Sequence, residues 1–492
     1  MSSKLEKARK YESENAGTIP KNQRPVYHMS VPVGWMNDPN GFSMYQGEAH
    51  LFYQYYPYET RWNSMHWGHV KTEDFIKWTY LPAALAPDEE YDGDGIFSGS
   101  AVENMGKQVL MYTGVKEISG HGQEKEVRQN QCIAVGDGID FVKLKENPVI
   151  TGDMLPKGSS LSDFRDPKIW KDDDTFYAVI GSRHADGSGQ IALFSSVDLK
   201  TWRFCNILDR CHNRFGKMWE CPDFFPLGEK YILAVSPQDM TAEGLEFHNG
   251  NGVMFLYGTF DKKDLTFKRE GVHSVDYGLD FYAPQTMLTE DGRRVMIAWM
   301  KSWDTNLWPE DFKWSSMMTI PRELEYRDGR VLQNPVREIQ NYYSDKVEYN
   351  RIQIQDRTRL DGISGRCLDM TVEVEAGDFQ EFRIDFAGDA KFYTSLIYNR
   401  EKQTVTFDRT YAGYCRDVVH TRSMYVREKD GKLKLRLLLD RYSAEIFVND
   451  GEQAMTSLVY TDQGANEIHF QSEGGSCISV KKFTIQESHK NI

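Results

Sequence analysis

Asp38 stands in a stretch that could hold a carboxylate ready for reaction. The stretch is Trp35-Met36-Asn37-Asp38-Pro39-Asn40-Gly41. Pro39 biases the residue before it toward an extended backbone and Asn40-Gly41 favours a tight turn, so the carboxylate would project from a strand end with little freedom. A surface turn would explain Asn-Asp-Pro-Asn-Gly alone, but the preceding Trp35 and Met36 favour a functional role. Such preorganisation suits a nucleophile.

Two later motifs carry acids in similar settings. They are Phe164-Arg165-Asp166-Pro167 and Trp219-Glu220-Cys221-Pro222-Asp223. Together with the first motif, and in this order, they resemble the signature of the β-fructosidases, glycoside hydrolase family 32, which includes invertases and sucrose-6-phosphate hydrolases. The likeness covers nearly the whole chain, because further segments also resemble the family, at Phe97–Ser100, Asp280–Gln285, Ile320–Leu324 and Asp440–Gly451.

Glycoside hydrolysis needs two carboxyl groups in opposite protonation states. The resemblance implies that Asp38 is the nucleophile that forms a covalent fructosyl-enzyme, and that Glu220 protonates the glycosidic oxygen and then activates water. Such a reaction retains configuration, which places the two carboxyls roughly 5 to 5.5 Å apart. The pKa of Glu220 must then be raised, by desolvation beside Trp219 and Cys221 and by repulsion from the other carboxylates, while Asp38 stays ionised, helped by nearby amides. By resemblance, Asp166 stabilises the transition state.

A sugar also needs hydrogen-bond partners and an aromatic face. The positions that match the family predict eight substrate-binding residues: Asn37, Gln54, Trp62, Phe97, Ser98, Arg165, Tyr282 and Trp299. Arg165 has two interpretations, a restraint on Asp166 or a substrate contact, and Trp62 and Trp299 could equally be packing residues. Asp223 has three interpretations: it restrains Glu220, it binds the leaving sugar, or it only caps a backbone group. No cofactor is predicted, and no metal, since the histidines show no ligand spacing.

Composition and charge narrow the class of protein. A chain of 492 residues is too long for one ordinary core, so two domains are expected. The formal charge of -14 argues against nucleic acid or an anionic membrane as partner, although a local basic pocket could still bind a phosphate. The family resemblance implies a small sugar as the partner. Met1 to Asn15 lack an apolar core, so neither a secretory signal nor an anchor is predicted, and a cytoplasmic location follows. The scattered cysteines fit reduced thiols, with Cys221 assigned to packing: Cys132, Cys205, Cys211, Cys221, Cys367, Cys415 and Cys477.

An internal repeat predicts how acids far apart in the chain come together. A strand followed by Asp-apolar-x-x-aromatic recurs, and the aromatic ends, Trp78, Phe141, Trp202 and Phe267, lie 63, 61 and 65 residues apart. This period predicts one four-stranded sheet per unit, as in a propeller, where the first strand of each blade lines a central axis. The site candidates fall one per unit, which implies five units: Asp38, Phe97-Ser98, Asp166, Glu220 and Tyr282.

The expected fold is all-β, a five-bladed β-propeller followed by a C-terminal β-sandwich, and the family resemblance implies the same architecture. Residues 1–25 are expected to form a charged helix and linker, 26–338 the propeller, 339–358 a linker with helical character, and 359–492 the sandwich, with a hairpin turn at Asn449-Asp450-Gly451. The sandwich could cover a propeller face, form a homodimer or bind sugar, and its alternating apolar residues support only the first.

The expected function is therefore a retaining glycoside hydrolase that cleaves terminal non-reducing β-D-fructofuranosides. Sucrose, sucrose 6-phosphate and short fructo-oligosaccharides are all open as substrates. The alternative within enzymes is a fructosyltransferase that uses the same intermediate with a sugar acceptor. The alternative outside enzymes is a silent sugar-binding propeller, which predicts at least one missing acid, whereas all three acids are present.

Overall fold

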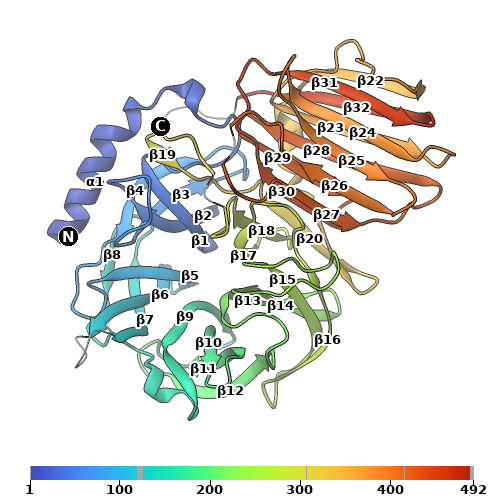
Figure 1. Cartoon of the computed structure of the whole chain (residues 1–492). Helices are drawn as coiled ribbons and strands as arrows, with labels where there is room; N and C mark the ends of the chain where they lie inside the picture. Colours follow the sequence, from blue (N-terminus) through green and yellow to red (C-terminus); the bar gives the residue numbers. More distant parts are fainter. Residues whose placement is uncertain (1, 119–125, 306, 415, 488–492) are drawn as a thin grey trace.

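The computed structural model describes residues 2–118, 126–305, 307–414 and 416–487. It consists of two β bodies that lie side by side, a ring of five sheets coloured blue to yellow and a stacked pair of sheets coloured orange to red (Figure 1). A β-propeller and a C-terminal β-sandwich are therefore confirmed. Within the described residues, no helix is both long and apolar enough to cross a membrane.

Each propeller blade is a four-stranded antiparallel sheet. The first two blades contain β1 Gly34–Tyr45, β2 Glu48–Tyr56, β3 His66–Thr72, β4 Thr79–Leu85, β5 Gly95–Asn104, β6 Lys107–Ile118, β7 Glu126–Gly136 and β8 Phe141–Lys143. The next two contain β9 Ser159–Asp172, β10 Thr175–His184, β11 Gly189–Ser196, β12 Arg203–Arg210, β13 Trp219–Leu227, β14 Lys230–Pro237, β15 Met254–Asp261 and β16 Thr266–Ser274. The fifth contains β17 Tyr282–Leu288, β18 Arg294–Trp299, β20 Arg322–Arg327 and β21 Arg330–Pro335.

The first strands of the blades form the inner wall of the ring. β1, β5, β9, β13 and β17 each contact the next, and β17 returns to contact β1. The repeat's aromatic residues lie where each outermost strand begins: Trp78 and Trp202 directly precede β4 and β12, and Phe141 and Phe267 lie at the start of β8 and β16. A short strand, β19 Trp314–Ser315, lies between β18 and β20 in the chain and pairs in parallel with β1, so it joins the fifth blade to the first.

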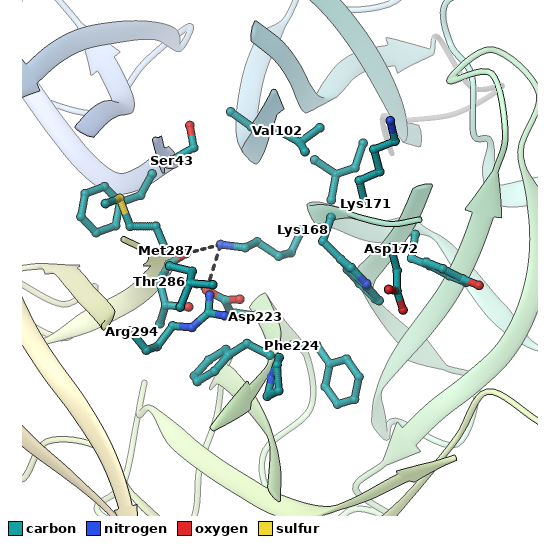
Figure 2. Close-up of a pocket in the computed structure, with 18 of the residues that line it drawn as sticks. Ser43, Val102, Lys168, Lys171, Asp172, Asp223, Phe224, Thr286, Met287 and Arg294 are labelled. Carbon is teal, nitrogen blue, oxygen red and sulfur yellow. Dashed lines mark hydrogen bonds and ion pairs between the residues drawn. The ribbon is translucent and has the colours of Figure 1, made fainter. Parts of the chain in front are cut away.

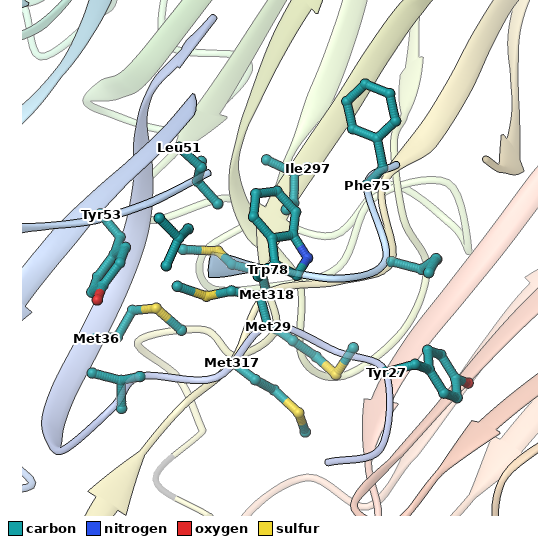
Figure 3. Packing of buried hydrophobic residues seen from close by; sticks show 14 of the residues in the cluster. Tyr27, Met29, Met36, Leu51, Tyr53, Phe75, Trp78, Ile297, Met317 and Met318 are labelled. Atoms are coloured by element: carbon teal, nitrogen blue, oxygen red, sulfur yellow. The ribbon is translucent and has the colours of Figure 1, made fainter. Parts of the chain in front are cut away.

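A methionine-rich core seals the junction between the first and fifth blades. Figure 3 shows Trp78 packed among Met29, Met318 and Ile297, which confirms the packing role of this repeat residue. Unbranched methionine side chains fill the irregular space where two twisted sheets meet. Met36, two residues before Asp38, is fully buried in the same cluster, so this core fixes the strand that carries the first acid.

The C-terminal body is a sandwich of a six-stranded and a five-stranded sheet. The first has the order β22 Tyr343–Ile354, β32 Ser476–Ile485, β23 Leu368–Glu375, β28 Lys432–Asp440, β29 Ser443–Val448 and β30 Gln453–Leu458. The second has the order β27 Thr421–Tyr425, β26 Thr404–Asp408, β25 Thr394–Asn399, β24 Glu381–Gly388 and β31 Glu467–Glu473. The predicted hairpin turn is confirmed, since Asn449, Asp450 and Gly451 all have positive φ between β29 and β30.

The predicted linker over residues 339–358 is wrong for most of its length. A 3-10 helix, η4 Arg337–Tyr342, leads directly into β22, which pairs antiparallel with β32 as an edge strand of the sandwich. Most side chains of β22 are exposed or half-buried. An edge strand with so few buried residues lacks the apolar alternation that identifies a strand in sequence.

The N-terminal segment is a helix, as predicted, but it is not merely solvated. Helix α1 Ser3–Asn15 begins at Ser2, whose hydroxyl accepts a hydrogen bond from Leu5 N at 3.2 Å. Leu5 and Ala8 are buried, and Arg9 Nε donates to Ala83 O of β4 at 2.8 Å. Three further 3-10 helices are short: η1 Ala16–Thr18, η2 Lys21–Gln23 and η3 Gly152–Met154.

The cysteines are reduced, as predicted, where the structure describes them. Six of the seven are free thiols, and Cys415 lies outside the described residues.

A buried ionic network joins the sandwich to the propeller. His28 Nδ1 lies 2.8 Å from Asp440 Oδ2, and His28 Nε2 lies 2.8 Å from Glu445 Oε1. Glu445 also accepts from the buried guanidinium of Arg322. Burial alone lowers the pKa of His28, but the hydrogen bonds to the two carboxylates outweigh it and raise the pKa to about 9. The sandwich therefore covers part of the propeller, the one role that its sequence supported.

Replacing His28 by Ala is expected to lower the free energy of unfolding by about 3–5 kcal/mol, because two buried carboxylates lose their shared partner. The histidine binds its proton more tightly when folded than when unfolded. Its stabilisation is thus complete below pH 6.5 and disappears as pH rises through about 9. Urea denaturation at several pH values measures both effects, with the exposed His212→Asn as control. Equal losses of stability between pH 6.5 and 9 in wild type and His28→Ala would refute this role.

Candidate active site

A β-bulge interrupts every inner strand at the predicted site residue. The register shifts lie between Met36 and Pro39, Phe97 and Gly99, Arg165 and Lys168, Glu220 and Asp223, and Tyr282 and Gln285. A bulge bends a strand and re-aims a side chain, so five bulges at one phase of the repeat turn side chains toward one end of the ring. A sequence signal accompanies four of the bulges, because prolines at 39, 167, 222 and 284 follow the bulged residues, and only the first of them was used in the prediction.

The bulges hold strained backbone next to the acids. Asp166 has φ +65°, Cys221 +46° and Ala283 +50°, so three residues other than glycine occupy the left-handed region at corresponding positions of three blades. Each such residue costs on the order of 1–3 kcal/mol and persists only where the surrounding structure fixes it. Here the fixed element is the closed ring of inner strands, which sets the direction of the Asp166 carboxylate.

One cavity of about 560 Å³ gathers nearly all predicted site residues. Its lining includes the three acids and six of the eight predicted binding residues: Asn37, Asp38, Gln54, Trp62, Phe97, Ser98, Arg165, Asp166 and Glu220. The acids come from β1, β9 and β13, three different blades. Asp38, Phe97-Ser98, Asp166 and Glu220 of the repeat's set therefore meet at one cavity, whereas Tyr282 does not line it.

Asp38 is buried at the floor of this cavity. Its Oδ2 accepts a hydrogen bond from Ser98 Oγ at 2.7 Å and lies 3.5 Å from Cys221 Sγ. Burial raises the pKa of Asp38 to about 6; the Ser98 hydroxyl opposes that shift and the charge of Glu220 adds to it. Near neutral pH the carboxylate is still the major form, as predicted, but it is closer to protonation than an ordinary aspartate.

Asp166 lies across the thiol of Cys221 from Asp38. Its Oδ2 accepts from Cys221 N at 3.0 Å and lies 3.6 Å from Cys221 Sγ. Burial raises the pKa of Asp166 to about 7; Arg165 opposes the shift, and the charges of Glu220 and Asp38 add to it. The packing role predicted for Cys221 is too narrow, since one cysteine contacts two of the three acids. Its bulged backbone, invisible in sequence, directs it there.

Glu220 is held from both sides by polar side chains. Arg165 donates to its Oε1 from Nη2 at 2.7 Å and from Nε at 2.9 Å, and the Tyr282 hydroxyl donates to its Oε2 at 2.6 Å. Arg165 Nε lies 4.0 Å from Asp166, so Arg165 restrains Glu220 more directly than Asp166, contrary to expectation. Tyr282 is fully buried and does not line the cavity, so it acts on the site by its hydrogen bond to Glu220.

The residues expected to desolvate Glu220 point elsewhere. The Trp219 indole donates to Phe215 O at 2.7 Å and is buried inside its own blade. Cys221 Sγ faces Asp38 and Asp166. Asp223 points away from the cavity: its Oδ2 accepts from Lys168 Nζ at 3.0 Å and Thr286 N at 2.6 Å, so neither functional interpretation of Asp223 holds. Past a bulge the alternation of side chains fails, and sequence spacing no longer gives their direction.

Aromatic side chains rim the open end of the cavity. Trp62 is 45% exposed and meets Phe97 edge to face at 5.8 Å between ring centroids. Trp299 does not line the cavity. It is fully buried, donates through its indole to Ser316, and lies behind Trp303, which is 41% exposed and lines the cavity in its place. The sequence could not separate these two tryptophans, because stacking and packing tryptophans look alike.

Amide side chains complete the site. Gln54 donates to Ile96 O at 2.9 Å, and Asn37 accepts from the Trp35 indole at 2.9 Å, which fixes its amide beside Asp38. Sequence reasoning missed Gln129 and Asp163. Both line the cavity and hold Arg165, Gln129 at 3.2 Å and Asp163 at 3.3 Å from its Nη1. Gln129 belongs to β7, which the repeat did not associate with the site.

A ring of bulged strands that gathers three carboxyl groups below an aromatic-rimmed cavity defines a glycosidase of the propeller type. The model of the glycosyl hydrolases family 32 N-terminal domain matches residues 28–335, and that of the family 32 C terminal matches residues 338–487. The chain belongs to glycosyl hydrolases family 32.

Named relatives and solved structures agree with this membership. The chain is 35% identical over 464 residues to a raffinose invertase of Escherichia coli, with 92% of this chain and 93% of the relative covered. It is 34% identical over 457 residues to a sucrose-6-phosphate hydrolase of Escherichia coli, with the same coverage. The structure of a GH32 beta-fructofuranosidase of Bombyx mori is 33% identical, covers 99% of both chains and has a TM-score of 0.86. A mutant of that enzyme has been solved in complex with sucrose.

Proposed function

We propose that this enzyme is a retaining β-fructofuranosidase in which Asp38 is the nucleophile, Glu220 the acid and base, and Asp166 the transition-state stabiliser. The observation that carries the proposal is the connection of the three carboxyl groups at one end of the ring. Cys221 contacts Asp38 and Asp166, and Arg165 contacts Glu220 and lies beside Asp166. The family and the relatives named β-fructofuranosidase and invertase support the reaction class.

In the first step, an oxygen of Asp38 bonds to the anomeric carbon of the fructosyl unit while the bond to the leaving oxygen breaks. Glu220 gives its proton to that oxygen, and the leaving sugar departs as an alcohol. The hydrogen bond from Ser98 to Asp38 Oδ2 fixes the direction of the attacking carboxylate. The contacts from Arg165 and Tyr282 fix the Glu220 carboxyl on the opposite side of the reacting carbon, which we expect to lie between the two acids.

In the second step, Glu220 removes a proton from water, the water oxygen bonds to the anomeric carbon, and the bond to Asp38 breaks. The two displacements together retain configuration, which corresponds to carboxyls roughly 5 to 5.5 Å apart. Asp166 accepts hydrogen bonds from fructosyl hydroxyls as positive charge develops on the ring. Its strained backbone and its bond from Cys221 N hold that carboxylate in place before substrate binds.

Product analysis tests this function. Purified enzyme incubated with sucrose is expected to release glucose and fructose in equal amounts. Trisaccharides formed at high sucrose, with glucose in excess over fructose, would indicate the transferase alternative. Binding of sucrose without release of either sugar would indicate a silent propeller and contradict the proposal.

The charges of the cavity favour a neutral leaving group. Within the described residues, Arg165 is the only basic side chain in its lining, and Glu220 engages it. Asp94, Glu117 and Asp163 add further carboxylates to the lining. A phosphate dianion on the departing glucose would meet these charges. At low ionic strength, kcat/KM for sucrose is therefore expected to exceed that for sucrose 6-phosphate by about tenfold, and the ratio should fall with added salt. A preference for the phosphorylated sugar would contradict this expectation.

The cytoplasmic location, the homodimer and sugar binding by the sandwich remain predictions. Cell fractionation tests the location, and light scattering tests the homodimer. Titration of an Asp38→Asn variant with sugar tests the sandwich, because binding there would appear as a second site.

A further inference from the structure

A second cavity opens at the other end of the propeller's inner wall. Its volume is about 460 Å³, within the range of about 300–1,000 Å³ typical of small-molecule sites. Lys168, Asp223 and Thr286 line it, two, three and four residues beyond Asp166, Glu220 and Tyr282 on the same inner strands. It is therefore separate from the catalytic cavity, with which it shares no lining residue.

Lys168 and Arg294 place two cations near one carboxylate in this cavity, and only Lys168 is paired with it. Lys168 Nζ donates to Asp223 Oδ2 at 3.0 Å and to Thr286 O at 2.6 Å, as the dashed lines in Figure 2 show. Arg294 of β18 lies close by, with its guanidinium over the Phe225 ring at 4.8 Å. Among the described residues, Arg294 has no carboxylate within ion-pair distance. The group formed by Lys168, Arg294 and Asp223 thus carries a net positive charge in a chain whose formal charge is -14.

Three buried polar atoms in the same place lack hydrogen-bond partners within the part of the chain that is described. They are Arg294 Nε, Thr286 Oγ1 and Asp223 Oδ1, and both Thr286 and Asp223 are 1% exposed. Such groups are uncommon in folded proteins and need a partner. The arginine nitrogen requires an acceptor and favours an anion, while the carboxylate oxygen requires a donor such as a hydroxyl. A ligand that satisfies all three carries an anionic group and a hydroxyl close together.

The walls of the cavity are aromatic. Trp170 stacks on Tyr177 at 5.5 Å between ring centroids, and Phe224 stacks on Tyr231 at 5.2 Å, and all four line the cavity. Flat aromatic faces of this kind suit the apolar face of a sugar ring. We propose that this cavity binds a small phosphorylated sugar, with its phosphate on Arg294 and Thr286 and a hydroxyl on Asp223. The acidic catalytic cavity would reject the same ligand.

Isothermal titration of the full-length enzyme with glucose 6-phosphate tests the proposal. We expect saturable binding to one site, unchanged by excess fructose in the catalytic cavity, and weaker at high salt. Arg294→Gln should weaken binding by at least about tenfold, because a charged hydrogen bond is lost. Arg327→Gln, an exposed arginine of the same blade that pairs with Glu325, is the matched control and should bind as wild type.

Thr286→Val provides a second variant, because it keeps the side-chain shape if Arg294→Gln fails to fold. Its binding should be about threefold to tenfold weaker through the lost hydroxyl. Parallel titrations with inorganic phosphate and with glucose separate the two halves of the ligand, and both should bind more weakly than the ester. Equal binding of inorganic phosphate and the ester would overturn the sugar assignment. The site would be overturned by any of three results. These are no binding, loss of binding when fructose is present, and equal affinities in wild type, Arg294→Gln and Thr286→Val.

Discussion

Asp38→Asn is expected to lower kcat for sucrose by about 10⁴-fold or more, because an amide cannot form the covalent bond to the fructosyl unit. The protein should become more stable. The folded-state pKa of Asp38, about 6, lies above the ordinary aspartate value of 3.8, so its buried charge opposes folding near neutral pH. Removing that charge while keeping the shape should raise the free energy of unfolding by about 1–3 kcal/mol.

Steady-state kinetics and urea denaturation measure the two effects. Asp94→Asn is the matched control, since Asp94 lines the same cavity and its carboxylate accepts from Glu117 N rather than from a residue of the catalytic group. Its kcat should stay within about fivefold of wild type. In the wild-type enzyme, kcat/KM should fall as pH drops below about 6, where Asp38 takes up a proton. Substantial turnover by Asp38→Asn, or a rate independent of pH through this range, would refute the nucleophile.

Glu220→Gln is expected to lower kcat for sucrose by about 10²–10⁴-fold, because the leaving glucose then departs without a proton. Glutamine keeps an oxygen for Arg165 and the side-chain volume, so the fold should be preserved. A β-fructofuranoside with an aryl leaving group needs little protonation. Its first step should stay fast and its second step slow, which would produce a burst of phenol followed by slow turnover.

Two comparisons make the result specific to an acid and base. Azide, which attacks without a base, should accelerate the slow phase in Glu220→Gln and yield a fructosyl azide. Tyr282→Phe, which removes one hydrogen bond to Glu220 but keeps the carboxyl, should cost only about tenfold. Equal losses for sucrose and for the aryl substrate, with no burst, would show that Glu220 acts elsewhere in the reaction.

The sequence predicted the parts of the fold that repeat. The aromatic residues Trp78, Phe141, Trp202 and Phe267 mark the outer strand of four blades, and their spacing placed Asp38, Asp166 and Glu220 at one phase. A residue's position within the repeat determines which strand of the blade it occupies. Closure of the ring then brings the first strands of all blades together. The edge strand β22 was missed because few of its side chains are buried, so it has no apolar pattern.

Side-chain direction within the site was harder to predict. Arg165 pairs with Glu220, Cys221 contacts two acids, and Asp223 faces the opposite cavity, and each of these residues lies at or just beside a bulge. A bulge adds one residue to a strand and reverses the alternation on which sequence reasoning depends. The prediction for Trp299 failed for a different reason: this indole is fully buried and Trp303 lines the cavity instead, and burial of an indole cannot be read from its own sequence.

Mass spectrometry of a trapped intermediate tests the central claim most directly. Glu220→Gln, mixed with the aryl β-fructofuranoside and quenched in acid during the slow phase, should carry one added fructosyl unit. Peptide fragmentation should place that unit on Asp38. An adduct on any other residue, or a quenched enzyme with no adduct despite the burst, would contradict the account.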